Sequence, residues 1–460
     1  MFTSQEVLRA VKGKLLKGDP GTNFKGISID SRSIKNEELF VAIKGKRFDG
    51  HDFVSQALAK AGGAVVSKRF LLSRPRLVNN KKSIFLVKDT LTSLGDIASS
   101  RRNRFKGTVL AVTGTTGKTT TTGILASVLK QKYKVLKSEA SFNNFVGLPL
   151  TLFKLNSAVQ IAVLEMGTSG IGEIKRLAEI SRPDLGVIIN IGPAHLGYLG
   201  NLQGVYRAKL ELLEAMDKNT LAAINGDDKK LLSRAKLFRP RITTFGMNRD
   251  CDFRASEVSY SEGKLRFVLN GCKQLKLKAL GRYNVYNALA AISLAGQLGL
   301  NFNLIKKGLA DIDLPPGRME VKKIGDIRLI DDSYNSNPLS LGSAIDTLAG
   351  LSVKGKKILV SGDMLELGSG SESAHQQIGK KVASSGVNVL ITVGNLARQI
   401  SRAACRSGMK KDEVFDCGSI EDAMDCLKTQ AAGGDIILVK GSRATRMERV
   451  VENFIASYRS

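Results

Sequence analysis

A glycine- and threonine-rich run that directly follows an apolar stretch limits the folds open to this chain more than any other feature. The residues VLAV at 109–112 precede TGTTGKTTTT at 113–122, an order typical of a strand, a tight loop and a helix. Gly114 and Gly117 let the loop turn its N–H groups inward, Lys118 adds a cation, and the hydroxyl of Thr119 is placed to ligate Mg²⁺. The run predicts an α/β protein that binds the phosphates of ATP.

The loop departs from the common phosphate-binding pattern GxxxxGK[ST]. That pattern needs a glycine at position 112, where this chain has Val112, and the nearer Gly114 lies inside the loop. We therefore expect a tighter variant. A strand-to-helix turn with a chance lysine is the alternative, and the agreement of the strand, loop and helix contexts argues against it. The residues expected to hold the nucleotide here are Gly114, Thr115, Thr116, Gly117, Lys118, Thr119 and Thr120.

Length and composition favour a folded chain of several domains. The 460 residues are 43% hydrophobic and 24% charged, which is usual for a globular protein, and domains of about 100–200 residues suggest three of them. No apolar run approaches the ~18 residues that span a bilayer, and no basic and then apolar leader begins the sequence, so we expect a cytoplasmic protein. Five cysteines without a CxxC pair favour neither a disulfide framework nor a zinc site.

The formal net charge of +28 is unevenly distributed. Lysine and arginine minus aspartate and glutamate give 22 − 9 = +13 for residues 1–107, 28 − 16 = +12 for 108–313 and 20 − 17 = +3 for 314–460. The excess fits anionic ligands bound by the first two regions, but a basic surface could also bind nucleic acid without specificity. The densest cluster, RRNRFK at 101–106, lacks interleaved aromatic residues, so we expect a solvated interdomain segment there.

Alternating strand-like and helical segments predict three α/β domains, at residues 1–107, 108–313 and 314–460. The first is expected to be small. In the second, strands at 159–165 and 185–191 alternate with helices after Lys118, near Glu173 and through Lys209, which predicts a mostly parallel sheet. A more strand-like region at 250–280 precedes an expected amphipathic helix at 281–300. After the double proline of DLPPGRME, four strands interleaved with helices predict a Rossmann-like sheet.

Three polar side chains are expected at the rim of the central sheet. Glu165 ends an apolar strand, where a carboxylate needs a cation or donors, and a magnesium ion on ATP is such a cation. His195 follows the next strand. Lys209 lies on a helix with an apolar face. If the Lys209 side chain faces the site, its neutral amine could add carbon dioxide and become a carbamate that binds a second magnesium. Structural alternatives remain: a loop contact for Glu165, a structural loop histidine and a solvent-facing lysine.

Four strings resemble the Mur ligase family of peptidoglycan precursor synthesis: TGTTGKTT at 113–120, LEMG at 164–167, NIGPAHL at 190–196 and AKLE at 208–211. The order matches along the whole chain. A second set, SFNNFVGLPLT, DDSYNSNP, SGDMLELG and KGSRATRMERVV, resembles members that join D-alanyl-D-alanine to UDP-N-acetylmuramoyl-tripeptide. The resemblance implies an ATP- and Mg²⁺-dependent amide ligase, a monomer without nucleic acid or membrane partners, and a carbamylated Lys209.

The resemblance also assigns expected roles to single residues. Asn287 resembles the adenine contact, and Arg318 and Asp332 resemble groups that reach the ATP phosphates and ribose. Catalytic roles would fall to Lys118, Glu165, His195, Lys209 and Arg318, and metal ligation to Thr119, Glu165, His195 and Lys209. The expected substrate-binding residues are Ser28, Asp30, Ser31, Arg32, Gly45, Asp49, Gly50, His51, Asn143, Asn144, Asn335 and Asn337, with Gly147 and Pro149 beside the two asparagines at 143–144.

Simpler interpretations stay open for several of these residues. SIDSR at 28–32 could be an ordinary turn instead, and Asp332 and Asn337 could cap the helix that Asn337-Pro338 would begin. His375, in SESAHQQIG, is open between a substrate-pocket role and a surface position, with a slight preference for the pocket.

The mechanism that the resemblance implies is activation of the tripeptide carboxylate as an acyl phosphate, followed by attack of the D-alanyl-D-alanine amine, with the PPGR segment as a hinge for domain closure. The rivals are a related ligase that adds a single amino acid, like an earlier Mur ligase or folylpolyglutamate synthase, and a basic ATPase that binds nucleic acid. No helix-turn-helix, zinc-knuckle or aromatic RNA-binding signature supports the last.

Overall fold

The computed structural model describes residues 2–68, 82–139, 141–261 and 264–458. Contacts divide the chain into two compact units. Unit 1 comprises Met1–Ala111, Tyr133–Gly167 and Glu173–Asp184, and unit 2 comprises Val112–Lys132, Thr168–Gly172 and Leu185–Ser460. Both are α/β, as the sequence predicts. Among the described residues, no helix is long and apolar enough to cross a membrane.

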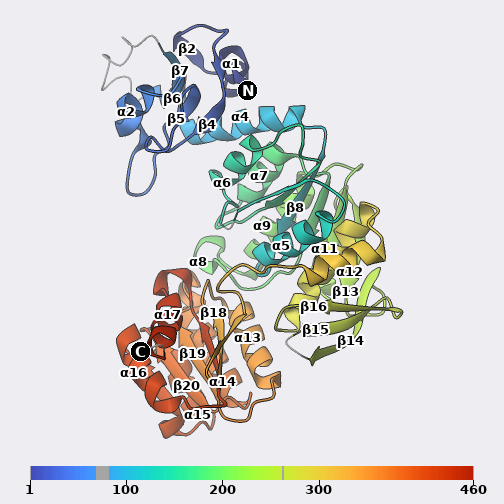
Figure 1. Ribbon diagram of the computed structural model, residues 1–460, viewed down its shortest axis with the longest axis vertical. Coiled ribbons are helices and arrows are strands. Elements are labelled where there is room, and N and C mark those ends of the chain that lie inside the picture. Colours follow the sequence, from blue (N-terminus) through green and yellow to red (C-terminus); the bar gives the residue numbers. More distant parts are fainter. Residues whose placement is uncertain (1, 69–81, 140, 262–263, 459–460) are drawn as a thin grey trace. The chain divides into compact units, whose positions relative to one another are not determined.

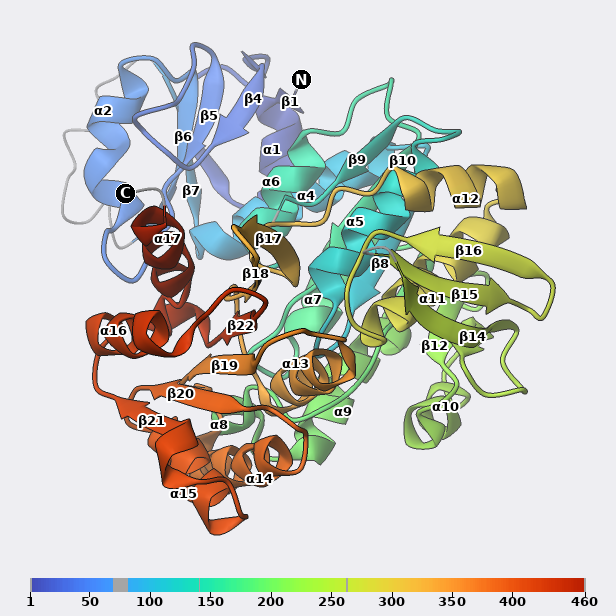
Figure 2. The ribbon, with the colours of Figure 1, turned by 60° about the horizontal axis from the view of Figure 1, so that its bottom comes forward.

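Unit 1 begins with a five-stranded sheet in the order β2-β7-β6-β5-β4, in which only β2 runs antiparallel to its neighbour. Helix α2 covers one face through Val54, Ala57 and Leu58. Helices α1 and α4 cover the other face (Figure 2). The elements are β1 (Phe2–Thr3), α1 (Ser4–Val11), β2 (Lys14–Lys17), β3 (Asn23–Phe24), β4 (Gly26–Ser28), β5 (Glu38–Val41), η1 (Gly50–Phe53), α2 (Val54–Leu58), β6 (Gly63–Ser67), β7 (Ser83–Val87) and α4 (Thr90–Arg104).

The rest of unit 1 contains strands in the order β8-β10-β9 with the helices α6 and α7. Strand β10 ends at Glu165, the residue where the sequence predicts the strand to end. The bounds are β8 (Thr108–Thr113, shared with unit 2), β9 (Val135–Lys137), α6 (Gly147–Phe153), β10 (Ile161–Glu165) and α7 (Glu173–Ser181).

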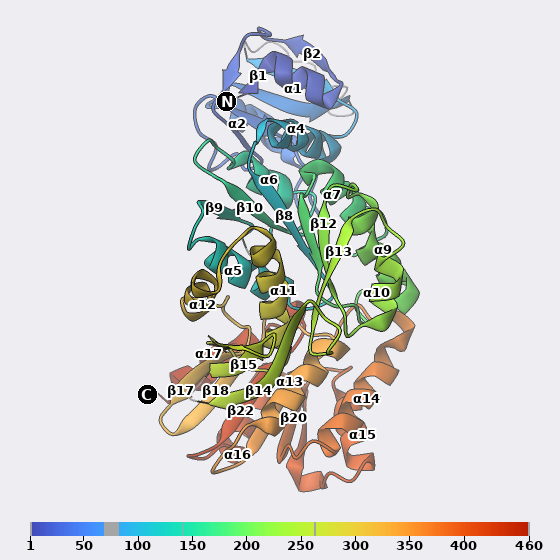
Figure 3. The same cartoon turned by 90° about the vertical axis from the view of Figure 1, so that its right-hand side faces the viewer.

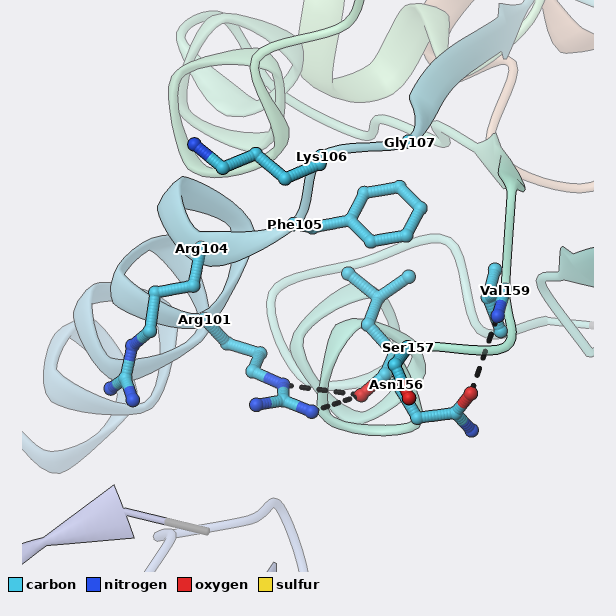
Figure 4. A pocket seen from close by; sticks show the side chains of 9 residues that line it. Arg101, Arg104, Phe105, Lys106, Gly107, Asn156, Ser157 and Val159 are labelled. Carbon is cyan, nitrogen blue, oxygen red and sulfur yellow. Dashed lines mark hydrogen bonds between the residues drawn. The ribbon is translucent and has the colours of Figure 1, made fainter.

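The basic cluster at 101–106 ends α4 and lines a cavity of about 340 Å³ (Figure 4). Arg101 donates from Nε to the carbonyl oxygen of Leu155 at 3.2 Å, on the opposite wall of that cavity. Arg102 donates to the carbonyl oxygen of Ser181 at 2.8 Å, and its side chain is only 11% exposed. The expectation of a solvated segment is therefore wrong for these two arginines, whose guanidinium groups satisfy backbone carbonyls.

Unit 2 contains a second sheet in the order β16-β15-β14-β13-β12-β11-β8. Pairing is parallel from β11 to β14 and antiparallel from β14 to β16, so the strand-rich region at 250–280 forms a meander (Figure 3). The elements are α5 (Lys118–Leu129), β11 (Leu185–Ile188), α8 (Leu196–Leu199), α9 (Leu202–Glu214), β12 (Leu221–Asn225), α10 (Lys229–Ala235), β13 (Arg241–Gly246), β14 (Phe253–Ser261), β15 (Lys264–Leu269), β16 (Lys273–Leu277), α11 (Tyr283–Gln297) and α12 (Phe302–Ala310).

Helix α11 corrects one sequence expectation. It forms where the sequence predicts a helix, but it is buried on nearly all sides and is not amphipathic. It packs against α5 and the strands β12 to β14. The run of alanines at 288, 290, 291 and 295 allows this close packing, because each small side chain leaves room for a neighbouring element.

The C-terminal part of unit 2 is a six-stranded sheet in the order β17-β18-β22-β19-β20-β21, parallel except for β17. Helices α13 to α15 cover one face and α16 and α17 the other (Figure 1). The sequence predicted four of these strands and missed β17 and β21. The bounds are β17 (Glu320–Ile324), β18 (Ile327–Asp332), α13 (Pro338–Gly350), β19 (Lys357–Gly362), η3 (Gly368–Gly370), α14 (Ser371–Ala383), β20 (Val389–Val393), α15 (Arg398–Arg406), η4 (Lys411–Glu413), β21 (Val414–Cys417), α16 (Ile420–Gln430), β22 (Ile436–Lys440), η5 (Arg443–Thr445) and α17 (Glu448–Ser457).

Candidate nucleotide and metal site

The phosphate loop joins the end of β8 to the start of α5 and depends on two glycines. Gly114 has φ 155° and Gly117 has φ 81°, conformations that L side chains rarely adopt. A Cβ atom at Gly117 would lie 2.2 Å from Asn287 Oδ1. In the part of the chain that the structure describes, no side chain caps the N-terminus of α5. Its first N–H groups therefore suit an anion such as a phosphate.

The segment after β11 holds this loop. Asn190 Oδ1 accepts from the Thr116 N–H at 3.0 Å, and the Asn190 carbonyl accepts from the Thr115 N–H at 3.0 Å. The Thr115 hydroxyl also accepts from the Gly192 N–H at 3.0 Å. Sequence reasoning missed Asn190, whose only indication was its place as the first polar residue after an apolar strand.

Two cations lie at the loop. Lys118 Nζ donates to the carbonyl oxygens of Gly114 at 3.0 Å and Thr115 at 3.3 Å. Arg318 Nη2 donates to Thr119 Oγ1 at 3.0 Å, and the guanidinium carbon lies 4.1 Å from the centre of the Tyr334 ring. Arg318 Nε is buried without a hydrogen-bond partner among the described residues. A buried donor without a partner is costly, so this nitrogen favours an anionic ligand.

His195 and Lys209 share the electrostatic environment of the loop. Burial lowers the pKa of His195 and Glu366 opposes this, while the charges of Lys118 and Lys209 lower the pKa further. His195 therefore tends to be neutral and able to ligate a metal. Lys209 lies on α9 and is 3% exposed, so the solvent-facing alternative is wrong. Burial penalises an ammonium group, which is the condition that carbamate formation needs.

Asn287 and Asp332 are both buried. Asn287 is 1% exposed, lies against Gly117 and donates from Nδ2 to Asn284 Oδ1 at 2.7 Å. Asp332 forms an ion pair of 2.6 Å with Lys440 and accepts from the Met319 N–H at 3.2 Å. The helix-capping alternative is therefore wrong for Asp332. Roles in adenine or ribose binding stay predictions.

Asn335 accepts from the distant Lys440 and Arg443 as well as locally, whereas Asn337 makes local contacts. Asn335 Oδ1 accepts from the Ser336 N–H at 2.9 Å. Asn337 caps α13, because its Oδ1 accepts from the Ser340 N–H at 2.9 Å. The capping alternative is confirmed for Asn337, and substrate binding by either residue stays a prediction.

Glu165 and the asparagines at 143–144 form a separate group in unit 1. Glu165 is 3% exposed, and its Oε1 accepts from Asn143 Nδ2 at 2.8 Å. Asn144 Oδ1 accepts from the N–H groups of Val146 and Gly147, where α6 begins. Pro149 lies in the same helix. The loop contact expected as the alternative for Glu165 is therefore present, and magnesium binding by Glu165 stays a prediction.

The expected substrate residues near the N-terminus lie in two turns of unit 1. Asp30 accepts from Arg32 Nε at 2.9 Å and Nη2 at 2.7 Å, which lowers the pKa of Asp30 to about 2. Ser28 bonds to the backbone of Asp30, and Ser31 donates to Gln56 at 3.1 Å. These contacts describe a compact turn with an exposed arginine, so both interpretations of SIDSR stay open.

The second turn runs from Gly45 to His51. The Gly45 N–H donates to the carbonyl of Phe48 at 2.8 Å, and a Cβ atom at Gly50 would lie 2.7 Å from the Ile43 nitrogen. His51 Nδ1 donates to Asp49 Oδ1 at 2.6 Å. The turn is therefore ordered by its own polar groups and by glycine.

His375 has a structural role that neither sequence interpretation anticipated. The ring is fully buried; Nδ1 donates to the Ser371 carbonyl at 2.7 Å and Nε2 accepts from the Met364 N–H at 3.0 Å. Both ring nitrogens are thus occupied by backbone groups, which corrects the expectation of a pocket or surface position.

Within unit 2 the structure brings together Lys118, Thr119, His195, Lys209, Asn287 and Arg318. The described residues include no cluster of three or more His, Cys, Asp or Glu side chains that could hold a metal. The expected ligands instead combine a hydroxyl, an imidazole and a lysine with the separate carboxylate of Glu165. The mostly parallel sheets, a loop with glycine at its two positive-φ positions and the two cations beside it define a nucleotide-dependent α/β enzyme.

Comparison with known proteins identifies the family. Three family models match: the Mur ligase family catalytic domain at residues 23–102, the Mur ligase middle domain at 112–295, and the Mur ligase glutamate ligase domain at 317–443. The chain belongs to the Mur ligase family and is a ligase.

Full-length relatives and solved structures agree with this assignment. UDP-N-acetylmuramoyl-tripeptide–D-alanyl-D-alanine ligase of Bacillus subtilis is 35% identical over 99% of this chain and 98% of its own length. The crystal structure of MurF from Acinetobacter baumannii has a TM-score of 0.87 at 28% identity and covers 99% of both chains. MurF from Thermotoga maritima in complex with ADP has a TM-score of 0.84 at 30% identity, over 95% of this chain and 98% of that one.

Proposed function

We propose that this chain joins D-alanyl-D-alanine to UDP-N-acetylmuramoyl-tripeptide with ATP, in peptidoglycan precursor synthesis. One observation carries the proposal: a relative named for this activity aligns over 99% of this chain and 98% of its own length. The rival ligases that add a single amino acid share the architecture, so the acceptor is what an experiment must establish.

ATP is the proposed nucleotide, supported by the phosphate loop and by the ADP named for the Thermotoga maritima neighbour. Lys118 and the first N–H groups of α5 bind the outer phosphates. Arg318 adds a second cation, and its Nε, which has no partner among the residues that the structure describes, is available for an oxygen. Asn287 and Asp332 are proposed to bind adenine and ribose, and Thr119 to contact the metal that accompanies ATP.

Magnesium fits the oxygen donors of this chain, which are a hydroxyl, a carboxylate and the proposed carbamate. When bound, it would neutralise charge on the phosphates and on the substrate carboxylate. Thr119 and Glu165 are each proposed as magnesium ligands. His195 and carbamylated Lys209 are the proposed ligands of a second magnesium ion.

The reaction proposed is phosphoryl transfer followed by amide formation. The tripeptide carboxylate takes the γ-phosphoryl group and ADP leaves; the D-alanyl-D-alanine amine then attacks the acyl carbon, phosphate departs and a proton is lost. The chain contributes positioning and charge, which such a transfer needs more than a protein nucleophile. Substrate contacts are proposed for Ser28, Asp30, Ser31, Arg32, Gly45, Asp49, Gly50, His51, Asn143, Asn144, Asn335 and Asn337.

The test combines the purified chain with ATP, Mg²⁺, D-alanyl-D-alanine and a UDP-linked tripeptide that ends in either lysine or diaminopimelate. Mass spectrometry of the product and measurement of ADP are the readouts. We expect one amide bond per ADP and no product with single amino acids as acceptors. A preference for a single amino acid, or no ADP with either tripeptide, would refute the proposal.

A further inference from the structure

The loop Met364–Gly368 contacts the segment that carries His195. His195 Nδ1 lies 2.6 Å from Glu366 Oε2, and the Gly197 N–H donates to the Glu366 carbonyl at 3.1 Å. Gly368 has φ 60°, and a Cβ atom on it would lie 3.0 Å from Gly197 Cα, so a side chain at this position would be strained and crowded. The contact joins residues in the ranges that match the middle and the C-terminal family models.

Both residues of the His195–Glu366 pair have an unusual backbone. His195 has φ 53° and Glu366 has φ 64°, a left-handed conformation that costs energy for residues with a Cβ atom. Such conformations persist where surrounding contacts fix them, and they concentrate at functional sites. Here the backbone on each side of the contact is bent so that one imidazole meets one carboxylate.

The loop is held from the interior of the C-terminal sheet domain. The Met364 N–H donates to His375 Nε2 at 3.0 Å, and the Leu365 N–H donates to Ser442 Oγ at 2.9 Å. His375 and Ser442 are both buried. These two bonds fix the backbone immediately before Glu366, so its position does not depend on its own half-exposed side chain.

We propose that Glu366 is a positioning residue that fixes the tautomer and orientation of His195, leaving His195 Nε2 with a lone pair for the metal site. A carboxylate can only accept, so Nδ1 must carry the proton and Nε2 is then unprotonated in the neutral ring. A histidine that binds a metal through one nitrogen commonly donates from the other to a carboxylate. The metal-binding part rests on the proposed function; the tautomer does not.

The inference links the C-terminal domain to the metal site. Because Glu366 comes from that domain, His195 is oriented for ligation only while the loop lies against the segment at 195–197. Domain closure would then complete the ligand set as well as exclude water.

Ring-nitrogen NMR of the metal-free protein tests the tautomer directly. The chain has three histidines, so two-bond ¹H–¹⁵N spectra at pH 8 are simple, and His195→Gln assigns the signal. We expect the Nδ1–H tautomer for His195 in the unmodified protein and a shift toward Nε2–H in Glu366→Ala. Glu366→Gln, whose amide oxygen still accepts, should keep the original tautomer. His51 and His375 serve as internal references, since both also donate from Nδ1.

The matched control is Glu372→Ala, an exposed glutamate of the same domain whose side chain accepts from Gln376 on its own helix. It should leave all three histidine signals unchanged. An unchanged His195 tautomer in Glu366→Ala would overturn the inference, and so would a change at His375, which would show that the loop itself had moved.

Magnesium dependence supplies the second readout. We expect Glu366→Ala to raise the Mg²⁺ concentration for half-maximal activity by about tenfold to a hundredfold, with KM for ATP little changed and partial recovery in Glu366→Gln. Equal loss of activity at all Mg²⁺ concentrations would contradict a role at the metal site. If the unmodified protein lacks ligase activity, the proposed function fails, whereas the NMR result still decides the tautomer.

Discussion

Replacing Gly117 by alanine tests the geometry of the phosphate loop. The left-handed backbone costs about 1–2 kcal/mol for an L residue. The new Cβ atom would also lie 2.2 Å from Asn287 Oδ1, and Asn287 is buried and bonded to Asn284, so it cannot move aside freely. Overpacking of this kind costs about 1–3 kcal/mol. We therefore expect the free energy of unfolding to fall by about 2–5 kcal/mol. If the loop relaxes instead, the loss should appear as weaker ATP binding.

Urea denaturation and calorimetric titration with ATP separate these two outcomes. Gly123→Ala is the matched control: Gly123 lies inside α5 with φ outside the left-handed range, and outside its own helix no described heavy atom comes within 4 Å of its added Cβ. It should raise stability by about 0.5–1 kcal/mol. Adding Asn287→Ala to Gly117→Ala should restore the steric part of the loss. Unchanged stability and ATP affinity in Gly117→Ala would refute the reasoning.

Three further substitutions or measurements follow from the site. Lys209→Ala should abolish ligation, with partial rescue by a short-chain carboxylic acid but not by carbonate; full activity would contradict the carbamate. Asn190→Ala leaves the Thr116 N–H without its acceptor, and an unsatisfied buried donor costs about 1–3 kcal/mol, so ATP binding should weaken about tenfold. An unchanged dissociation constant in calorimetry would argue against a role of Asn190 in holding the phosphate loop. Burial, with Asp227 nearby, raises the pKa of the Cys251 thiol to about 11. At pH 8, mass spectrometry should therefore find the exposed Cys272 alkylated well before Cys251, and the alkylation rate of Cys251 should rise about tenfold per pH unit up to pH 11. Equal alkylation rates at pH 8 would contradict the raised pKa.

Local patterns in the sequence predicted much of the fold. The end of β10 at Glu165 and the start of α5 at Lys118 agree with the predictions, because apolar runs and glycines determine them locally. Strands β17 and β21 were missed because they lie at the edges of their sheet and carry exposed or charged residues. Helix α11 was expected to be amphipathic, since the sequence alone does not reveal that it is covered on both sides.

In the candidate site, too, the sequence predicts residues in contiguous patterns and misses residues that act through distant partners. The phosphate loop is a contiguous pattern, so the sequence predicts it, and Arg318 was found through the family resemblance. Asn190 and Glu366 act through partners 74 and 171 residues away. No local pattern marks such residues. His375 was misjudged because it lies in α14, and the sequence does not show that the Met364 N–H of the preceding loop meets its ring.

The histidines give this enzyme a sensitivity to acid that its surface does not reveal. In His51 and His375 the Nε2 atom accepts a backbone N–H, from Ser67 and Met364 respectively. A second proton on the His375 ring would place an N–H against the Met364 N–H and break that bond. Burial lowers the pKa of His375 below its usual 6.5, so its stabilising bond is fully present above pH 6.5 and is lost as the pH falls through the lowered value. Acidification through that lowered pKa would therefore loosen the loop that carries Glu366, because the bond between the Met364 N–H and His375 helps to hold it.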